Sequence, residues 1–208
     1  MEFSNWNQIK IIGIFLCSIF SLTIYYFANK VSVQLLVFAH SILSSFSSII
    51  SLIFGFDPSY SISFTSVYFI FHTFYIHQEP CKLTEKITTY FHHLLGLGFG
   101  FPELILQKNG YVCLCFQANE VSNIFLSWYR WKKTNISGIF FAIAFFSTRV
   151  LWDTFYILPF LLPTASLYLK VLSVPLFTIQ YIWLYKIIRK FTNFILKQKS
   201  KKEEKKIN

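Results

Sequence analysis

The feature that most constrains this chain is a series of seven apolar runs separated by short polar segments. A run of about 20 apolar residues is long enough to cross a bilayer as an α-helix. Within lipid the backbone must be helical, because each unpaired peptide group there costs several kcal/mol. The sequence therefore predicts an all-α membrane protein with seven transmembrane helices, at Ile9–Phe27, Gln34–Phe54, Tyr60–Ile76, Ile87–Leu106, Tyr111–Trp128, Ile136–Leu158 and Thr164–Ile188.

The composition supports a membrane protein and argues against a soluble one. Of the 208 residues, 54% are hydrophobic and 13% are charged, whereas soluble domains carry roughly 25% charged residues. The loops between the runs are too short to form a separate soluble domain. The first run lacks a basic leader and a small-residue cleavage site, so we interpret it as a retained helix rather than a signal peptide.

The net charge of +10 indicates topology rather than nucleic-acid binding. Fifteen of the 19 basic residues fall on one side of the predicted membrane, and only Lys10 and Lys108 fall on the other. Cytoplasmic loops collect Lys and Arg, so the C-terminus is expected in the cytoplasm. We expect the lysine-rich tail to face anionic lipid head groups and no nucleic acid to be a partner.

The last four residues, Lys205 to Asn208, have the form of a cytosolic dilysine retrieval signal, which predicts the endoplasmic reticulum. The alternatives are a lysine-rich tail without that role and another organelle membrane. Asn135 begins a glycosylation sequon that falls on the predicted cytoplasmic side and is expected to stay unmodified. The cysteines form neither a disulfide framework nor a metal site by their spacing; Cys81 is expected to be an unmodified thiol, with acylation as the alternative.

Ionisable side chains are costly in hydrocarbon, so those within the runs are functional candidates. Arg149 and Asp153 are four residues apart and are predicted to pair on one helix face. The alternative is that Arg149 contacts a phosphate or a lipid head group. The fifth run carries a polar stripe that must face other helices or a wet cavity, formed by Gln117, Glu120 and Ser127 with Asn119 and Asn123 beside it.

The adjacent pair His92 and His93 is the most informative of these candidates. Neighbouring residues on a helix point about 100° apart, so the two rings cannot have the same role. A buried neutral imidazole can accept a proton from an amine or a hydroxyl during acyl transfer. The alternative is that the rings only form hydrogen bonds with the fifth or sixth helix. Gly96 and Gly100, four residues apart, are predicted to allow close helix packing.

Four segments in this order resemble the TLC-domain family, whose best-known branch is the ceramide synthases. The segments are Ser66–Phe71, Tyr90–Leu95 with the double histidine, Asn119–Leu126 and Phe145–Arg149. Asn119–Leu126 is similar to a stretch of the branch that does not synthesise ceramide. The resemblance spans roughly Gln34 to Arg189.

The resemblance implies a six-helix barrel around a cavity that takes a lipid chain. It implies an N-terminal helix outside the barrel at residues 1–33, a TLC-like domain at 34–190 and a basic cytoplasmic tail at 191–208. Two departures point away from ceramide synthesis. His72 stands where the family often has an aspartate, and the fifth helix lacks the further histidine and paired aspartates of the synthases.

The predicted function is lipid binding within the barrel, with an influence on membrane lipid composition or homeostasis, and without a cofactor or a metal. Lipid or head-group contacts are expected from Arg149, His72, Gln117 and Asn123. The first alternative is a ceramide-synthase-like acyltransferase with acyl-CoA as substrate, in which His92 or His93 is the general base, Glu120 orients it and Arg149 contacts a phosphate. The second alternative is a structural subunit of a larger membrane complex with protein partners in the membrane.

Overall fold

The computed structural model describes residues 2–78, 82–106 and 108–207, and it describes side chains within 8–77, 82–106, 108–193 and at 196. The described residues are almost entirely helical and contain no β-strand, which confirms the all-α fold class. Cys81 and the side chains of the tail lysines from Lys197 onward lie outside the described part. The α-helices are α1 (Glu2–Val31), α2 (Val33–Phe54), α3 (Pro58–Tyr75), α4 (Leu83–Leu106), α5 (Gly110–Ala118), α6 (Val121–Lys132), α7 (Asn135–Phe145) and α8 (Leu167–Ile207).

In the described part of the chain, four helical segments are long and apolar enough to cross a membrane, by length and composition. They coincide with the first, second, sixth and seventh predicted spans, and they are Gln8–Val31, Val33–Phe54, Asn135–Thr164 and Leu167–Asn193. The third, fourth and fifth predicted spans are helical as well, in α3, α4 and α5–α6, but they do not meet that criterion.

Two predicted spans differ from regular α-helices. The fifth is broken at Asn119 and Glu120, which form a turn between α5 and α6. The sixth continues beyond α7 as two π-helical segments, η2 (Phe146–Leu151) and η3 (Asp153–Leu161), followed by a 3₁₀ turn, η4 (Leu162–Thr164). π-Helical segments are rare and frequently occur at functional sites.

Local sequence signals explain where several helices begin and end. The hydroxyl of Ser32 accepts a hydrogen bond from the Leu35 N–H at the start of α2. Gly55 ends α2 with a φ of 69°, a left-handed conformation that glycine adopts without strain. Asp57 caps α3 by accepting from the Ser59 N–H, and Pro58 occupies the first turn, where its missing N–H is not needed.

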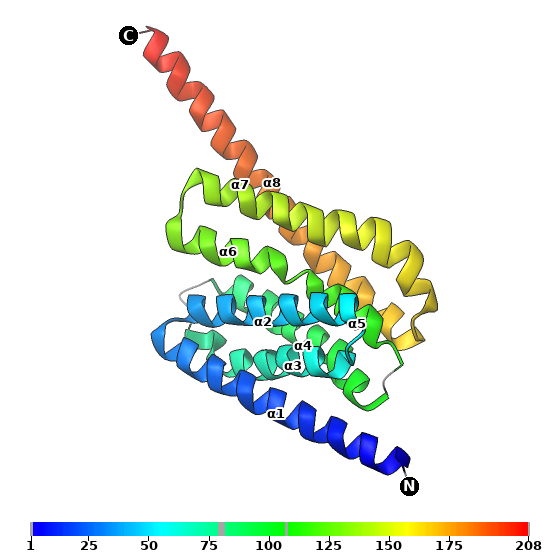
Figure 1. Ribbon diagram of the computed structural model, residues 1–208. Coiled ribbons are helices and arrows are strands. Elements are labelled where there is room, and N and C mark those ends of the chain that lie inside the picture. Colours follow the sequence, from blue (N-terminus) through cyan, green and yellow to red (C-terminus); the bar gives the residue numbers. More distant parts are fainter. Residues whose placement is uncertain (1, 79–81, 107, 208) are drawn as a thin grey trace.

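Helix α3 lies inside the bundle, packed against α1, α2, α4 and α5. Helix α2 also packs on α5 and α6, α6 packs on α7, and α8 packs on α4 and η2. In Figure 1 the C-terminal part of α8 projects away from the other helices, and α1 lies along the outside. Tyr25 on α1 is nevertheless fully buried against α2 and α3.

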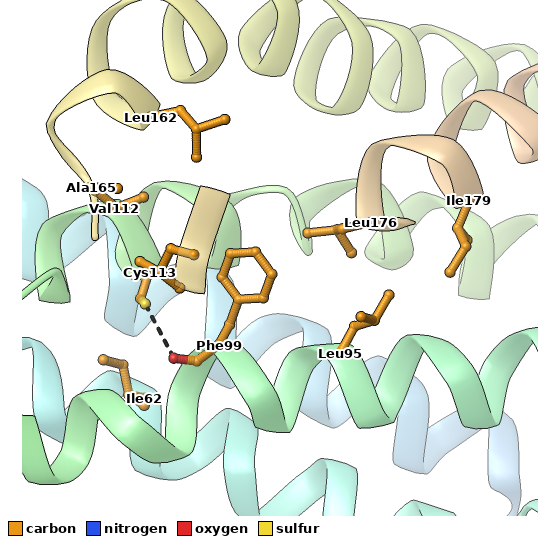
Figure 2. Close-up of a cluster of buried hydrophobic side chains, with 10 residues drawn as sticks. Ile62, Leu95, Phe99, Val112, Cys113, Leu162, Ala165, Leu176 and Ile179 are labelled. Carbon is orange, nitrogen blue, oxygen red and sulfur yellow. Dashed lines mark hydrogen bonds between the residues drawn. The ribbon is translucent and has the colours of Figure 1, made fainter. Parts of the chain in front are cut away.

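The main apolar core joins α3, α4, α5, η4 and α8 (Figure 2). In Figure 2, Leu95 and Phe99 extend from α4 toward Leu176 and Ile179 of α8. Outside the core, large apolar side chains are exposed over most of α1 and over much of α8, including Ile11 at 66%. Exposed apolar surface of this extent is typical of helices that face lipid.

The interface of α2 with its neighbours is built from small hydroxyl residues. Ser44 bonds to Thr65 at 2.7 Å and Ser47 bonds to Ser61 at 2.8 Å. Small residues allow close approach of two helices, and their hydroxyls can bond across the contact. The sequence analysis did not single out this interface, although its α2 face repeats at the helical spacing in Ser41, Ser44, Ser45, Ser48 and Ser51.

The predicted packing role of the α4 glycines is confirmed. A Cβ atom on Gly96 would overlap the Phe69 ring, and one on Gly100 would lie 3.1 Å from the Ser66 hydroxyl. Both contacts are with α3, so these glycines allow α3 and α4 to approach closely.

Candidate functional site

A buried ion pair lies where α5 and α6 meet the π-helical segment. The Arg149 guanidinium donates to Glu120 Oε1 at 3.0 Å and to the Ser122 hydroxyl at 2.8 Å. The other carboxylate oxygen of Glu120 accepts from the Asn123 side chain at 2.6 Å. Arg149 is only 3% exposed and Glu120 only 6%. Both charges are therefore neutralised inside the protein.

The predicted pairing of Arg149 with Asp153 is wrong. Asp153 instead accepts a hydrogen bond from the Asn119 side chain at 2.7 Å. The prediction assumed α-helical stacking of residues four apart, whereas a π-helix joins residues five apart, as in the bond from the Trp152 N–H to the Ser147 carbonyl. The turn at Asn119 and Glu120 supplies a separate partner for each of the two charged residues.

A layer of aromatic and imidazole rings adjoins this ion pair. His40 of α2 stacks on Tyr68 of α3, with centroids 3.6 Å apart and planes 2° apart. His40 Nε2 lies 3.7 Å from Glu120 Oε2, and His40 Nδ1 lies 3.4 Å from the hydroxyl of Tyr25. The Tyr68 hydroxyl bonds to His72 Nδ1 at 2.9 Å. Helices α1, α2 and α3 therefore contribute side chains to one polar cluster.

The two adjacent histidines have different environments, as predicted from their 100° separation. His93 Nδ1 bonds to the Thr73 hydroxyl at 3.1 Å, and its ring lies 4.9 Å from that of His72. The His92 ring lies between Phe69 and Trp183, at 5.7 and 5.3 Å. His92 Nδ1 is buried and has no hydrogen-bond partner among the described residues. His40 Nε2 is likewise buried and has no hydrogen-bond partner among them.

A small cavity of about 60 Å³ lies between α3, α4, α5 and α8. Its wall includes Phe69, Gly96 and Gly100 on the α3–α4 side and Gln117 and Glu120 on the other. A water needs about 10–15 Å³ measured in this way, so the cavity has room for about four or five water-sized groups. It is a largely apolar space with a carboxylate and an amide at its edge.

The structure brings most of the predicted site residues into this region. His72, His93, Gln117, Glu120 and Arg149 are buried, and His92 and Asn123 are half-buried. No hydrogen bond joins Glu120 to His92 or His93 among the described side chains; the imidazole that lies within 4 Å of its carboxylate is that of His40. The Arg149 guanidinium, which was expected to contact a phosphate, instead donates hydrogen bonds to Glu120 and Ser122.

The sequence analysis missed His40, Tyr25, Tyr68 and Ser122. His40 had a usable signal, because it is an ionisable residue in the middle of an apolar run. Tyr25 had none. Tyr68 and Ser122 lie in the family-like segments Ser66–Phe71 and Asn119–Leu126, but nothing in those segments distinguished them from their neighbours.

The described part of the chain contains no group of three His, Cys, Asp or Glu side chains placed to hold a metal ion. No protein family, no curated protein and no solved structure was found to match this chain. The chemistry of the site is therefore the basis for assigning a function.

Proposed function

We propose that this protein is an integral membrane protein that binds lipid within its helical bundle and influences membrane lipid composition. The observations that support this proposal are a mostly apolar cavity with Gln117 and Glu120 in its wall and the buried Nδ1 of His92, which has no hydrogen-bond partner among the described residues and whose ring contacts Phe69 of that wall. Buried polar atoms in native proteins nearly always have a partner, so an unpaired one calls for a missing group. A lipid supplies both a polar group for the imidazole and an apolar chain for the cavity.

The same proposal includes seven spans, with α2 to α8 arranged as a TLC-like barrel. Helix α3 is less apolar than a lipid-facing span, but it is surrounded by four helices and its hydroxyls bond to α2 and α5. The break at Glu120 is also compatible with membrane depth, because irregular backbone is tolerated there when it is buried in protein. The distribution of basic residues supports an odd number of spans and a cytoplasmic C-terminus.

This topology is testable in microsomes from the endoplasmic reticulum, which is the proposed compartment. We expect Asn135 to remain unglycosylated and a C-terminal tag to be digested by protease added outside. Glycosylation of Asn135 would overturn the proposed orientation.

In the present conformation the cavity is too small for a whole acyl chain. Binding would require α4 and α8 to separate at Phe99 and Leu176, which both line the cavity. Phe99 and Leu176 belong to one apolar cluster, and one turn further along α4 the hydrogen bond from the Tyr168 hydroxyl to Glu103 keeps α4 joined to α8.

The test is mass spectrometry of lipids that co-purify with the protein in mild detergent. We expect one lipid class to be enriched over the bulk membrane in the wild type. His92→Phe should abolish the enrichment, because phenylalanine fills similar space but offers no nitrogen. The matched control is His77→Phe, which alters an exposed imidazole and should leave the enrichment intact. Lipid recovered in bulk membrane proportions from the wild type would contradict the proposal.

A second candidate is acyl transfer with His92 as general base. The observation that favours it is the difference between the two histidines, since His93 Nδ1 is bonded to Thr73 and His92 Nδ1 is not. The test uses acyl-CoA and a long-chain amine with the reconstituted protein. Formation of an N-acyl product in the wild type but not in His92→Phe would establish this activity. Bound lipid without any N-acyl product would refute acyl transfer and support lipid binding without catalysis.

A further inference from the structure

Three buried oxygen atoms that lack a hydrogen-bond donor belong to side chains grouped around one carboxylate. They are Asn119 Oδ1, Asp153 Oδ2 and Gln180 Oε1, and none has a hydrogen-bond partner among the described residues. Asp153 is fully buried, and Asn119 and Gln180 are 2% and 3% exposed. A single unsatisfied buried atom is already unusual in a native protein, so three acceptors around one carboxylate point to a missing group.

The three side chains come from separate elements that meet beside the broken helix. Asn119 lies in the turn between α5 and α6, Asp153 begins η3, and Gln180 lies on α8. Helix α5 packs on η3, and α8 packs on the preceding segment η2. The Asn119 amide donates to Asp153 Oδ1 at 2.7 Å, and the Gln180 side chain also lies close enough to interact with that carboxylate. Because the oxygen of an amide shares a carbon with its nitrogen, both amide oxygens lie near Asp153 as well.

The unsatisfied atoms are all acceptors. Turning the Asn119 amide over would not help, because its oxygen would then face Asp153 Oδ1 with no hydrogen between the two atoms. An ionised carboxylate and two amide carbonyls offer only lone pairs to a ligand. One water molecule has two hydrogens and can donate to only two of the three oxygens, whereas a cation can bind all three.

The charge balance also favours a cation. Asp153 forms no ion pair with the described side chains, and the guanidinium of Arg149 is instead paired with Glu120 at 3.0 Å. Burial of an ionised carboxylate without a compensating charge is costly. Helix α5 ends at Ala118, immediately before Asn119, and the C-terminal end of a helix carries a partial negative charge. The site therefore lacks one positive charge.

We propose that Asn119, Asp153 and Gln180 bind a dehydrated monovalent metal cation, Na⁺ or K⁺. One such ion balances the single carboxylate, and hard cations prefer oxygen ligands. Ca²⁺ takes about six to eight oxygen ligands and Mg²⁺ retains several waters, so divalent ions fit this set poorly. A lipid ammonium would bring an attached chain into a cluster that is at most 3% exposed, whereas a bare ion occupies the space of one atom. The ion would join the α5–α6 turn, η3 and α8.

The test is thermal unfolding of the full chain in mild detergent, titrated with NaCl or KCl while choline chloride keeps the ionic strength constant. An ion that binds only the folded protein raises Tm by about 3–6 °C for each tenfold increase in its concentration above the dissociation constant. We expect this response to at least one of the two metal ions, and the more effective one is the preferred ligand. A Tm that responds to neither ion would overturn the proposal and would indicate buried water or a protonated carboxylate instead.

Two variants separate an ion site from a purely structural hydrogen bond. Asp153→Asn should abolish the response to the ion and should raise Tm in choline chloride alone, because the uncompensated charge is gone and the new amide can donate to Gln180. Gln180→Met removes a neutral ligand and should shift the titration to higher ion concentrations. A response like that of the wild type in either variant would refute the site.

The matched control is Asp57→Asn, the same change at the other aspartate of the chain. Lys10 Nζ lies 2.6 Å from Asp57 Oδ2, so this charge already has a partner. Partial burial alone would raise the pKa of Asp57, but the hydrogen bonds from Lys10 and Ser59 bring that pKa below its ordinary value. Asp57→Asn should therefore lower Tm at neutral pH and keep the full response to the ion. Loss of the response in this control would contradict the site, because the ion would then act through the overall charge.

The ion site is independent of the lipid proposed for the cavity at His92. The wall of that cavity includes none of the three ion ligands. His92→Phe should abolish the lipid enrichment and leave the response to the ion unchanged. Failure of one site is thereby distinguishable from failure of the other.

Discussion

Replacing Arg149 by methionine tests whether the ion pair with Glu120 holds the broken helix in place. The change keeps an unbranched side chain but removes the guanidinium that donates to Glu120 at 3.0 Å and to Ser122 at 2.8 Å. Among the described residues, the Glu120 carboxylate would then keep Asn123 as its one hydrogen-bond donor. Removing one partner of a buried ion pair costs about 3–5 kcal/mol, because the other charge is left uncompensated.

The assay is thermal unfolding of the purified protein in mild detergent. For a chain of this length 1 kcal/mol corresponds to a shift of about 2–4 °C in Tm, so Arg149→Met should lower Tm by about 6–20 °C. Adding Glu120→Gln should recover more than half of that loss, since the isolated charge is then gone. The matched control is Arg130→Met, which removes an exposed guanidinium from α6 and should shift Tm by less than about 2 °C. An equal shift in the control, or a double variant no more stable than Arg149→Met, would refute the reasoning.

Three further outcomes follow from individual contacts. Tyr25→Phe removes the buried hydroxyl through which α1 bonds to its neighbours and should cost about 0.5–1.5 kcal/mol in the free energy of unfolding; an unchanged Tm would count against this contact. Gly96→Ala places a Cβ that overlaps the Phe69 ring and should cost about 1–3 kcal/mol by overpacking, measured in the same way. The Lys10–Asp57 pair should stabilise the wild type relative to Asp57→Asn above about pH 4, because the lowered pKa keeps Asp57 ionised there. That advantage should disappear as pH falls through the Asp57 pKa of the folded protein, and a pH-independent difference in Tm would exclude this role.

The helical fold class was predictable because it depends on run length and composition. Val33–Phe54 and Leu167–Asn193 are apolar over the length of a membrane crossing, and both are helical in the structure. The more polar third to fifth runs are also helical, but they are not long and apolar enough to be identified as membrane-crossing helices. The reason is tertiary: α3 lies among α1, α2, α4 and α5, so its surface need not be apolar.

The membership of the site was only partly predictable. The rule that ionisable groups in apolar runs are functional candidates identified His92, His93, Glu120 and Arg149. The same rule applied to His40 would have included the ring nearest to Glu120. No local signal indicated that Tyr25, 15 residues away on α1, would bond to His40.

The sequence by itself determined that the chain is helical, where its long apolar segments lie and which few ionisable groups are buried among them. These properties depend on the cost of exposing peptide groups and charges to lipid, which is set residue by residue. Only the tertiary structure decided the partners: Glu120 for Arg149, Asn119 for Asp153, and none among the described residues for His92 Nδ1. Those pairings depend on the turn at Glu120 and on the π-helical winding after Phe145, which bring together side chains far apart along the chain.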